Sequence, residues 1–163
     1  MTEGFSPKLV APGEGSTIML FGVRFDYKVV STDSGGSLAV LEVAIPAGTL
    51  VKPHNHSRED EFSLVLSGTV GVRIGDQVLT AGPGTYLVKP RGVPHAMWNA
   101  TDDPAKVVEI LSPGGLERYF EELAPILAEH RPAAEYYELA ENYGIGIQDD
   151  WIEDLERAYG VKL

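Results

Sequence analysis

GTLVKPHNHSREDEFSLVLSG (48–68) and GTYLVKPRGVPHAMWN (84–99) are the two stretches of this 163-residue chain that decide its fold. They hold three of the four histidines, a run of acids, and glycines and prolines where a chain must turn. His54 and His56 are two residues apart, so in a strand both imidazoles face the same side. We expect them to meet Glu61, at the start of the next strand, and His95, from a neighbouring strand, around one metal ion.

Short strand-like segments surround these two stretches from residue 17 onward. They are rich in β-branched and aromatic residues, and they end at turn signals such as residues 31–36, 46–48 and 82–84. Many short strands at regular spacing predict an all-β sandwich or barrel. The chain has no internal repeat that would indicate a second copy of the barrel.

The periodicity changes after residue 112, where apolar residues recur at three- and four-residue steps, as in helices. The last of these helices should present Trp151, Ile152 and Leu155 on one face and end before Gly160. We therefore predict an N-terminal arm over residues 1–16, a β-barrel over 17–111, and a helical extension over 112–163. The extension is too short for a separate domain, and we expect it to pack on the outside of the barrel or across its mouth.

Composition narrows the classes of function. The chain is 44% hydrophobic and 23% charged, as globular domains are, and it has no cysteine for a disulfide, a thiolate ligand or a nucleophile. The formal net charge of −11, without a basic cluster, makes nucleic acid and anionic membrane poor partners. The N-terminus does not have the pattern of a signal peptide, so we expect a cytoplasmic protein.

Three imidazoles and one carboxylate form a ligand set that suits one divalent transition metal ion. Fe, Mn, Co, Ni, Cu and Zn all fit it, whereas Ca and Mg prefer oxygen ligands. Four protein ligands leave one or two positions open for water, dioxygen or a substrate oxygen. A histidine pair alone is more often an ordinary surface feature, so the prediction depends on the combined spacing.

The same positions fit two sequence motifs of the cupin superfamily, which the chain therefore resembles. The motif G(X)5HXH(X)3-4E(X)6G is matched by Gly48, His54, His56, Glu61 and Gly68, and the motif G(X)5PXG(X)2H(X)3N by Gly84, Pro90, Gly92, His95 and Asn99. The resemblance implies a cupin-type double-stranded β-helix, or jelly-roll barrel, with the metal held by His54, His56, Glu61 and His95. Glu59 also lies near this turn, but the spacing to Gly68 favours Glu61.

Residues two and four positions from a ligand along a strand share its inward face. On that basis we expect Ser63, Val65, Met97 and Asn99 to line a mostly apolar substrate pocket, and we expect Tyr86, which precedes Pro90 of the second motif, to face inward as well. Trp98 would then point the other way, into the packing between barrel and helices. Simple filling of the barrel is the plainer interpretation of these residues, but an apolar lining favours a flat or aromatic organic substrate.

The segment HSREDEFSLVLSG (56–68), followed by a helical tail, is similar to small bacterial cupins related to quercetin 2,3-dioxygenase. This resemblance implies a metal-dependent dioxygenase that acts on a small organic, aromatic or flavonol-like substrate, with Glu61 as ligand and general base. Two alternatives remain open. One is a non-oxidative isomerase or polyketide cyclase at the same metal, and the other is a non-catalytic cupin that binds a small ligand. The resemblance also implies a homodimer.

Overall fold

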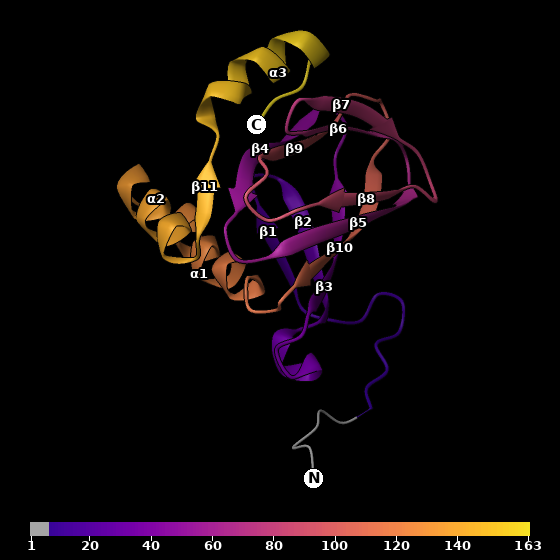
Figure 1. Cartoon of the computed structure of the whole chain (residues 1–163), viewed down its shortest axis with the longest axis vertical. Helices are drawn as coiled ribbons and strands as arrows, with labels where there is room; N and C mark the ends of the chain where they lie inside the picture. The colour runs from indigo at the N-terminus through magenta and orange to yellow at the C-terminus, as the bar shows by residue number, and fades with distance from the viewer. Residues whose placement is uncertain (1–6) are drawn as a thin grey trace.

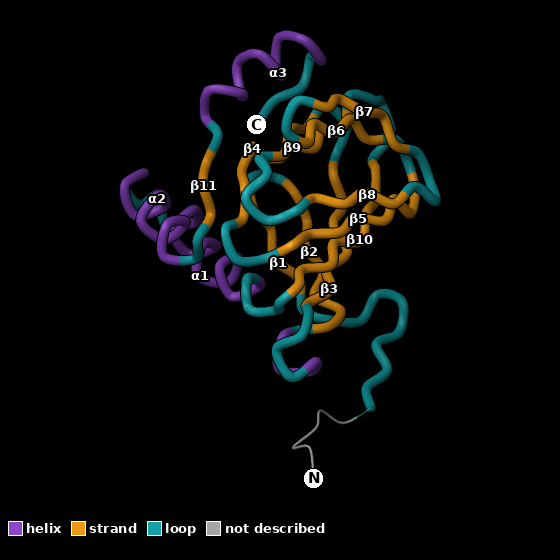
Figure 2. Tube along the Cα trace, in the orientation of Figure 1, coloured by secondary structure: helices purple, strands orange, loops and turns teal. Residues whose placement is uncertain are grey.

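The computed structural model describes residues 7–163 and contains two antiparallel sheets that form a barrel, with helices around it (Figures 1 and 2). One sheet has the strand order β1 (Thr17–Leu20), β2 (Val23–Val29), β3 (Ala39–Ile45), β10 (Ala105–Ser112), β5 (Asp60–Ser67) and β8 (Tyr86–Lys89). The other has the order β11 (Ile145–Ile147), β4 (Thr49–His56), β9 (His95–Asn99), β6 (Val70–Ile74) and β7 (Gln77–Ala81). The predicted fold class, an all-β jelly-roll barrel with a C-terminal helical extension, is confirmed.

The predicted N-terminal arm, residues 1–16, lies partly outside the described residues, which begin at position 7. Its described part, 7–16, has no strand and is fastened to the barrel by polar contacts. The backbone N–H of Tyr27 donates to the carbonyl of Ser16 at 2.8 Å, and Lys8 pairs with Asp33 in a short 3-10 helix, η1 (Ser31–Ser34), at 2.5 Å. That the arm pairs with a neighbouring subunit stays a prediction.

The core lies between the two sheets, and the central strands show how alternation builds it. Along β3 and β10 every second residue is buried, and Val43 lies opposite Val107 in the register of the pair. Successive side chains of a strand point to opposite faces, so one face of each strand fills the barrel. The inward row of β10 contains a single charged residue, Glu109, opposite Leu41.

The C-terminal extension covers the barrel in two places. The helices α1 (Glu117–Ala128) and α2 (Ala133–Asn142) lie against β1 and β11, whereas α3 (Ile152–Tyr159) lies apart from them at another side (Figure 1). The extension is not purely helical, because β11 joins the edge of β4, with Ile145 opposite His56 and Ile147 opposite His54. Within residues 7–163, none of the helices has the length and apolar character that a membrane span requires.

The last helix packs on the outer face of the five-stranded sheet through Trp98. Trp98 is 2% exposed, stacks on Tyr159 with ring centroids 4.4 Å apart, and belongs to a separate small cluster with Leu50, Ala96, Leu155 and Val161. The prediction that Trp98 points into the packing between barrel and helices is confirmed. As predicted, Gly160 ends α3, with a φ of 68° that favours glycine.

Gly71 of β6 makes room for the Trp98 ring, since a Cβ at this position would lie 2.2 Å from the indole. We expect Gly71→Ala to lower the free energy of unfolding by about 1–3 kcal/mol, because the buried indole must shift. Urea denaturation measures this. Gly82→Ala is the matched control, because a Cβ there meets no atom within 4 Å. Equal stability losses in the two variants would contradict the close packing.

Candidate metal centre

A bulge in β4 sets the direction in which its histidines point. Val51 lies opposite Met97 and His54 opposite His95, so β4 advances three residues while β9 advances two. The extra residue reverses the face presented by the later part of the strand. Val51, His54 and His56 consequently all line the same interior cavity. Pro53, which has no N–H to donate, falls in the interrupted part of the ladder, where proline is tolerated.

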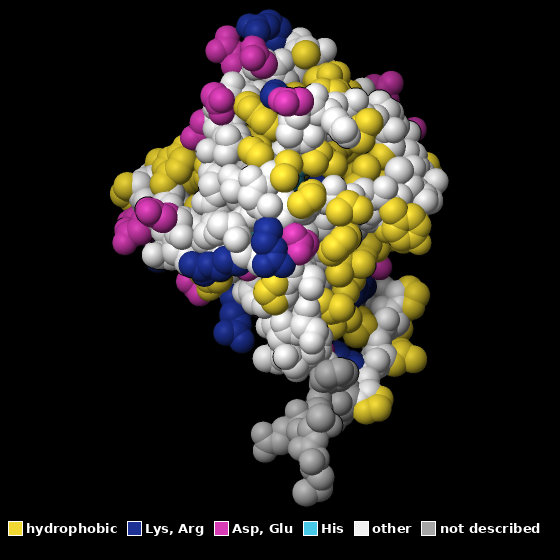
Figure 3. Space-filling model, in the orientation of Figure 1, with side chains coloured by type: hydrophobic (Ala, Val, Ile, Leu, Met, Phe, Trp, Pro, Cys, Tyr) yellow, Lys and Arg dark blue, Asp and Glu magenta, His cyan; other side chains and the backbone are white. Residues whose placement is uncertain are grey.

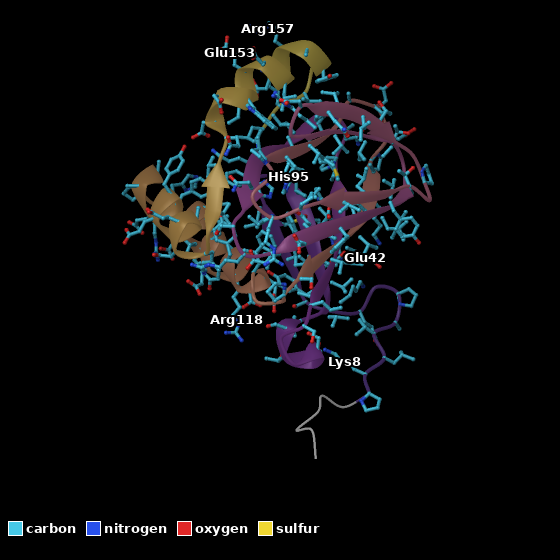
Figure 4. All side chains as sticks on the ribbon, viewed as in Figure 1. Lys8, Glu42, His95, Arg118, Glu153 and Arg157 are labelled. Atoms are coloured by element: carbon cyan, nitrogen blue, oxygen red, sulfur yellow. The ribbon has the colours of Figure 1, made fainter. Side chains whose placement is uncertain are left out.

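The four predicted ligands come together from both sheets. His54 and His56 lie on β4, His95 on the neighbouring β9, and Glu61 on β5 of the opposite sheet, and their ligand atoms all lie within 4.8 Å of one another. Nε2 of His56 lies 3.1 Å from both Nε2 of His54 and Oε2 of Glu61, and Nε2 of His95 lies 3.0 Å from the same oxygen. Figure 4 shows His95 in the interior of the barrel, between the two sheets.

The hydrogen bonds of the imidazoles leave nitrogen lone pairs aimed at the centre of this cluster. Nδ1 of His54 lies 2.6 Å from the carbonyl of Lys52, and Nδ1 of His95 lies 3.1 Å from that of Val93. A carbonyl oxygen only accepts, so both Nδ1 atoms carry the proton and both Nε2 atoms present a lone pair. Such backbone partners are the usual means of orienting histidine ligands.

The electrostatics of the histidines agree with a metal site. Burial, followed by the neighbouring histidines, lowers the pKa of His54 well below its usual value, and burial also lowers the pKa of His95, so both are neutral at pH 7. Nε2 of His95 is buried without a hydrogen-bond partner, because its approach to Glu61 lacks hydrogen-bond geometry. A buried polar atom left unpaired costs about 1–3 kcal/mol. A divalent transition metal bound by His54, His56, Glu61 and His95 would supply that partner, so the donor set fits the ion.

A buried lysine, which the sequence did not indicate, holds the other oxygen of Glu61. Nζ of Lys89 lies 3.0 Å from Oε1 of Glu61 and 2.9 Å from Oε2 of Glu109, and that oxygen also accepts a hydrogen bond from Ser63 at 2.7 Å. Lys89 is 4% exposed. Strand register brings these groups together, because Lys89 pairs with Glu61 and Ser63 with Glu109.

This network separates the pKa values of its two carboxyl groups. Burial alone would raise the pKa of Glu61, but Lys89 above all, and then the neighbouring His56 and His95, reverse the effect and hold it well below the usual value. Burial raises the pKa of Glu109 to about 8, against the opposing effect of Lys89. Glu61 is therefore a permanently ionised oxygen donor. Lys89 therefore lowers the basicity of Glu61, and the role of Glu61 as general base stays a prediction.

A narrow apolar cavity of about 70 Å³ opens beside His54 and His56. Its walls come from β1, β2, β4 and β11 and from helices α1 and α2, so the helical extension does lie across this mouth of the barrel. Aromatic side chains dominate the lining, contributed by Phe21, Phe25, Tyr119, Phe120 and Tyr136. Sequence reasoning missed these residues, because β1, β2 and the helices are far from the ligand motifs in the chain.

The five predicted pocket residues do not line this cavity. Ser63, Val65, Met97 and Asn99 are buried inside the barrel, where Asn99 donates to the carbonyls of Ile45 and Asp103. The prediction that Tyr86 lines the pocket is wrong, because its side chain is 76% exposed on the outer face of the sheet.

The reason for the Tyr86 correction is the register of β8. Leu87 and Lys89 are buried and face inward, so Tyr86 and Val88 must face outward. They join an apolar surface over β5 and β8, visible as a group of hydrophobic side chains in Figure 3.

We expect Lys89→Met to lower the free energy of unfolding by about 3–5 kcal/mol, because two buried carboxyl groups lose their shared cation. Chemical denaturation of the variant measures this. In the double variant Lys89→Met/Glu109→Met the loss should be smaller than the sum of the single losses. Lys106→Met is the control, because Lys106 pairs with Glu42 while 40% of its side chain is exposed, and such surface pairs contribute under about 1 kcal/mol. Equal losses for Lys89 and Lys106 would refute the network.

Comparisons with known proteins agree with this geometry. Residues 41–111 match the family model described as Cupin_2, cupin domain. Germin-like protein 3-1 of Oryza sativa subsp. japonica is 38% identical over 88 residues, which cover 47% of this chain and 38% of that protein. The chain spans less than two fifths of the length of the curated relatives that it matches.

Solved structures share the fold at low sequence identity. KdgF from Halomonas sp. aligns with a TM-score of 0.62 and 18% identity over 69% of this chain and 99% of that one. The polyketide cyclase RemF from Streptomyces resistomycificus aligns with a TM-score of 0.59 and 19% identity over 66% of this chain and 80% of that one. Together, the family match over residues 41–111, the two-sheet barrel and the ligand cluster make the barrel of this chain similar to a cupin domain.

Proposed function

We propose that this protein is a metal-dependent enzyme that acts on a small organic molecule, and that the reaction is a dioxygenation. The observation that carries the proposal is that three histidines and one glutamate form a cluster, two members of which, His54 and His56, line an apolar cavity. His54 and His56 line that cavity, so an ion held by the cluster would face the space where a substrate fits. When bound, a divalent transition metal supplies Lewis-acid activation of a substrate oxygen and, if redox-active, reaction of the substrate with dioxygen.

The size and lining of the cavity restrict the substrate. Its volume of about 70 Å³ is well below the roughly 300–1,000 Å³ of typical ligand pockets. The lining is mostly aromatic and aliphatic, which supports a flat, apolar molecule, as proposed from the sequence. A flavonol-sized substrate would require α1 and α2 to move away from β1, so a single-ring compound fits this conformation better.

The residues around the cluster have separable tasks in this proposal. The carbonyls of Lys52 and Val93 orient the imidazoles of His54 and His95, and Lys89 keeps Glu61 ionised with Oε2 directed at the histidines. The aromatic side chains exclude water from the substrate. Without a basic Glu61, an acidic phenol or enol that reaches the site already ionised is a more suitable substrate than an alcohol.

A second candidate is non-oxidative chemistry at the same metal, by an isomerase or a polyketide cyclase. Tyr119 and Tyr136 line the cavity, and burial raises the pKa of Tyr119 to about 12, so its hydroxyl remains a proton donor at neutral pH. A donor beside a Lewis acid suits the isomerisation or cyclisation of a carbonyl compound. The name of RemF, a polyketide cyclase of the same fold, is compatible with this candidate. A non-catalytic ligand-binding cupin is the third candidate, and the homodimer stays a prediction.

Dioxygen uptake separates these candidates. We expect protein loaded in turn with Fe, Mn, Co, Ni, Cu and Zn to consume dioxygen with catechols, enediols or flavonols when the metal is redox-active, and His95→Asn to abolish the uptake. His130→Asn should retain full uptake, because His130 is exposed, lies outside the cluster and has a φ of 52° that asparagine tolerates. Turnover that consumes no dioxygen and proceeds with Zn would support the isomerase or cyclase. Stoichiometric binding without product would support the binding protein.

A further inference from the structure

Lys52 lies in the wall of the cavity. Among the described residues that line it, Lys52 is the only lysine or arginine. Its Nζ lies 5.0 Å from the ring centroid of Tyr136 and 5.6 Å from that of Tyr137, and its side chain is 16% exposed. Aromatic faces attract a cation but do not replace the hydrogen bonds that the ammonium loses on burial. The group therefore requires an anionic partner.

In this structure the partner is Asp149, at the start of the short 3-10 helix η2 (Asp149–Trp151) that precedes α3. Its Oδ1 lies 3.0 Å from Nζ of Lys52, while its Oδ2 accepts a hydrogen bond from the hydroxyl of Tyr137 at 2.6 Å. The Asp149 side chain is 47% exposed, three times the fraction of Lys52. If Lys52 bound another anion, Asp149 would retain its hydrogen bond with Tyr137 and its freed oxygen would be hydrated. The more deeply buried Lys52, by contrast, needs an anion in place of Asp149.

The chain fixes Asp149 beside the metal-binding strand. The N–H of Gln148 donates to the carbonyl of Pro53 at 2.9 Å, and its side-chain amide donates to Asn55 at 3.1 Å. These contacts continue the pairing of β11 with β4, the strand that carries His54 and His56. Lys52 is thus joined to the metal cluster through its own carbonyl, which orients His54, and joined to the tail through its side chain.

We infer that Lys52 determines substrate specificity by binding an oxyanion, and that the substrate is a small apolar molecule with one carboxylate or enolate group. In this arrangement the anion replaces Asp149 on the Lys52 ammonium, and the apolar body lies among the aromatic side chains beside His54 and His56. Charge-assisted hydrogen bonds are among the stronger contacts that a ligand makes. Exchange of one carboxylate for another on the Lys52 ammonium costs little free energy, because one such bond replaces another. This inference deepens the proposed function and rests on its assignment of the cavity as the substrate site.

A simpler reading gives Lys52 and Asp149 a structural role only, as an ion pair that fastens the tail to the barrel. The two interpretations predict opposite changes in ligand affinity for the variant that lacks Asp149. If the pair is only a fastener, loss of either partner loosens the same contact, so both variants should affect ligand binding alike. If Lys52 binds the ligand and Asp149 competes for it, loss of Lys52 weakens binding and loss of Asp149 strengthens it.

Isothermal titration calorimetry with benzoate, cinnamate and octanoate, each compared with its neutral amide, tests the inference. The full chain is used both as purified and after removal of metal with EDTA, so that binding of the anion to a metal ion is separated from binding to Lys52. Wild-type protein should prefer at least one acid over its amide in both states. Lys52→Met should weaken binding of that acid about 10- to 100-fold and leave the amide unchanged.

Two further variants complete the experiment. Lys52→Arg keeps the charge and should bind the acid within about threefold of wild type, while Asp149→Asn should bind it several-fold more tightly. Thermal melting of each variant shows that the fold is retained. Equal weakening by Lys52→Met and Asp149→Asn, or no preference of wild type for any acid over its amide, would overturn the inference. Metal content is measured on the same samples, so failure of the metal site is distinguishable from failure of Lys52.

Discussion

The bulge in β4 is the constraint on which the candidate site depends. Without the extra residue between Val51 and His54, strict alternation would direct positions 53 and 55 inward and both histidines outward. With it, His54 and His56 face the cavity, and Lys52 lies at the cavity with its carbonyl free to orient His54. The pairing of β4 with β9 on one edge and β11 on the other holds this irregular segment in place.

The second requirement is the balance of charge behind the ligands. The four side chains of the cluster lie between the two sheets, largely shielded from water. A buried carboxylate such as Glu61 stays ionised only when a positive charge or hydrogen bonds compensate it. Lys89 meets this need by binding Glu61 and Glu109 together, so the charge of the glutamate ligand is compensated on the side away from the histidines. The same contact lowers the basicity of Glu61, and in the proposed function this would favour substrates that arrive already ionised. This links the network behind the site to the inferred choice of an anionic substrate at Lys52.

Much of the fold could be read from the sequence, because its signals are local. Short strands ending at glycine and proline turns, the helical periodicity after residue 112, and the outward position of Trp98 follow from spacing alone, and the structure agrees with them. The meeting of His54, His56, Glu61 and His95 was predicted from motif spacing, and the described cluster contains these four residues.

The features that escaped prediction depend on which strands become neighbours. Lys89 and Glu109 meet only because β8 and β10 flank β5, and nothing in the sequence around either residue indicates this pairing. Tyr86 was placed inward because the face of a four-residue strand cannot be judged without its register. The strand β11 has three residues with a glycine in the middle, too little for a periodic signal, although it covers the edge beside both histidines.

Metal content tests the candidate site most directly, determined by elemental analysis of protein purified from its native host, as wild type and as three asparagine variants. We expect about one equivalent of a divalent transition metal in wild type and in His130→Asn. We expect His54→Asn and His95→Asn to lose that metal while they retain the wild-type fold. Full metal content in both His54→Asn and His95→Asn, or no metal in wild type, would show that His54, His56, Glu61 and His95 do not form a metal site.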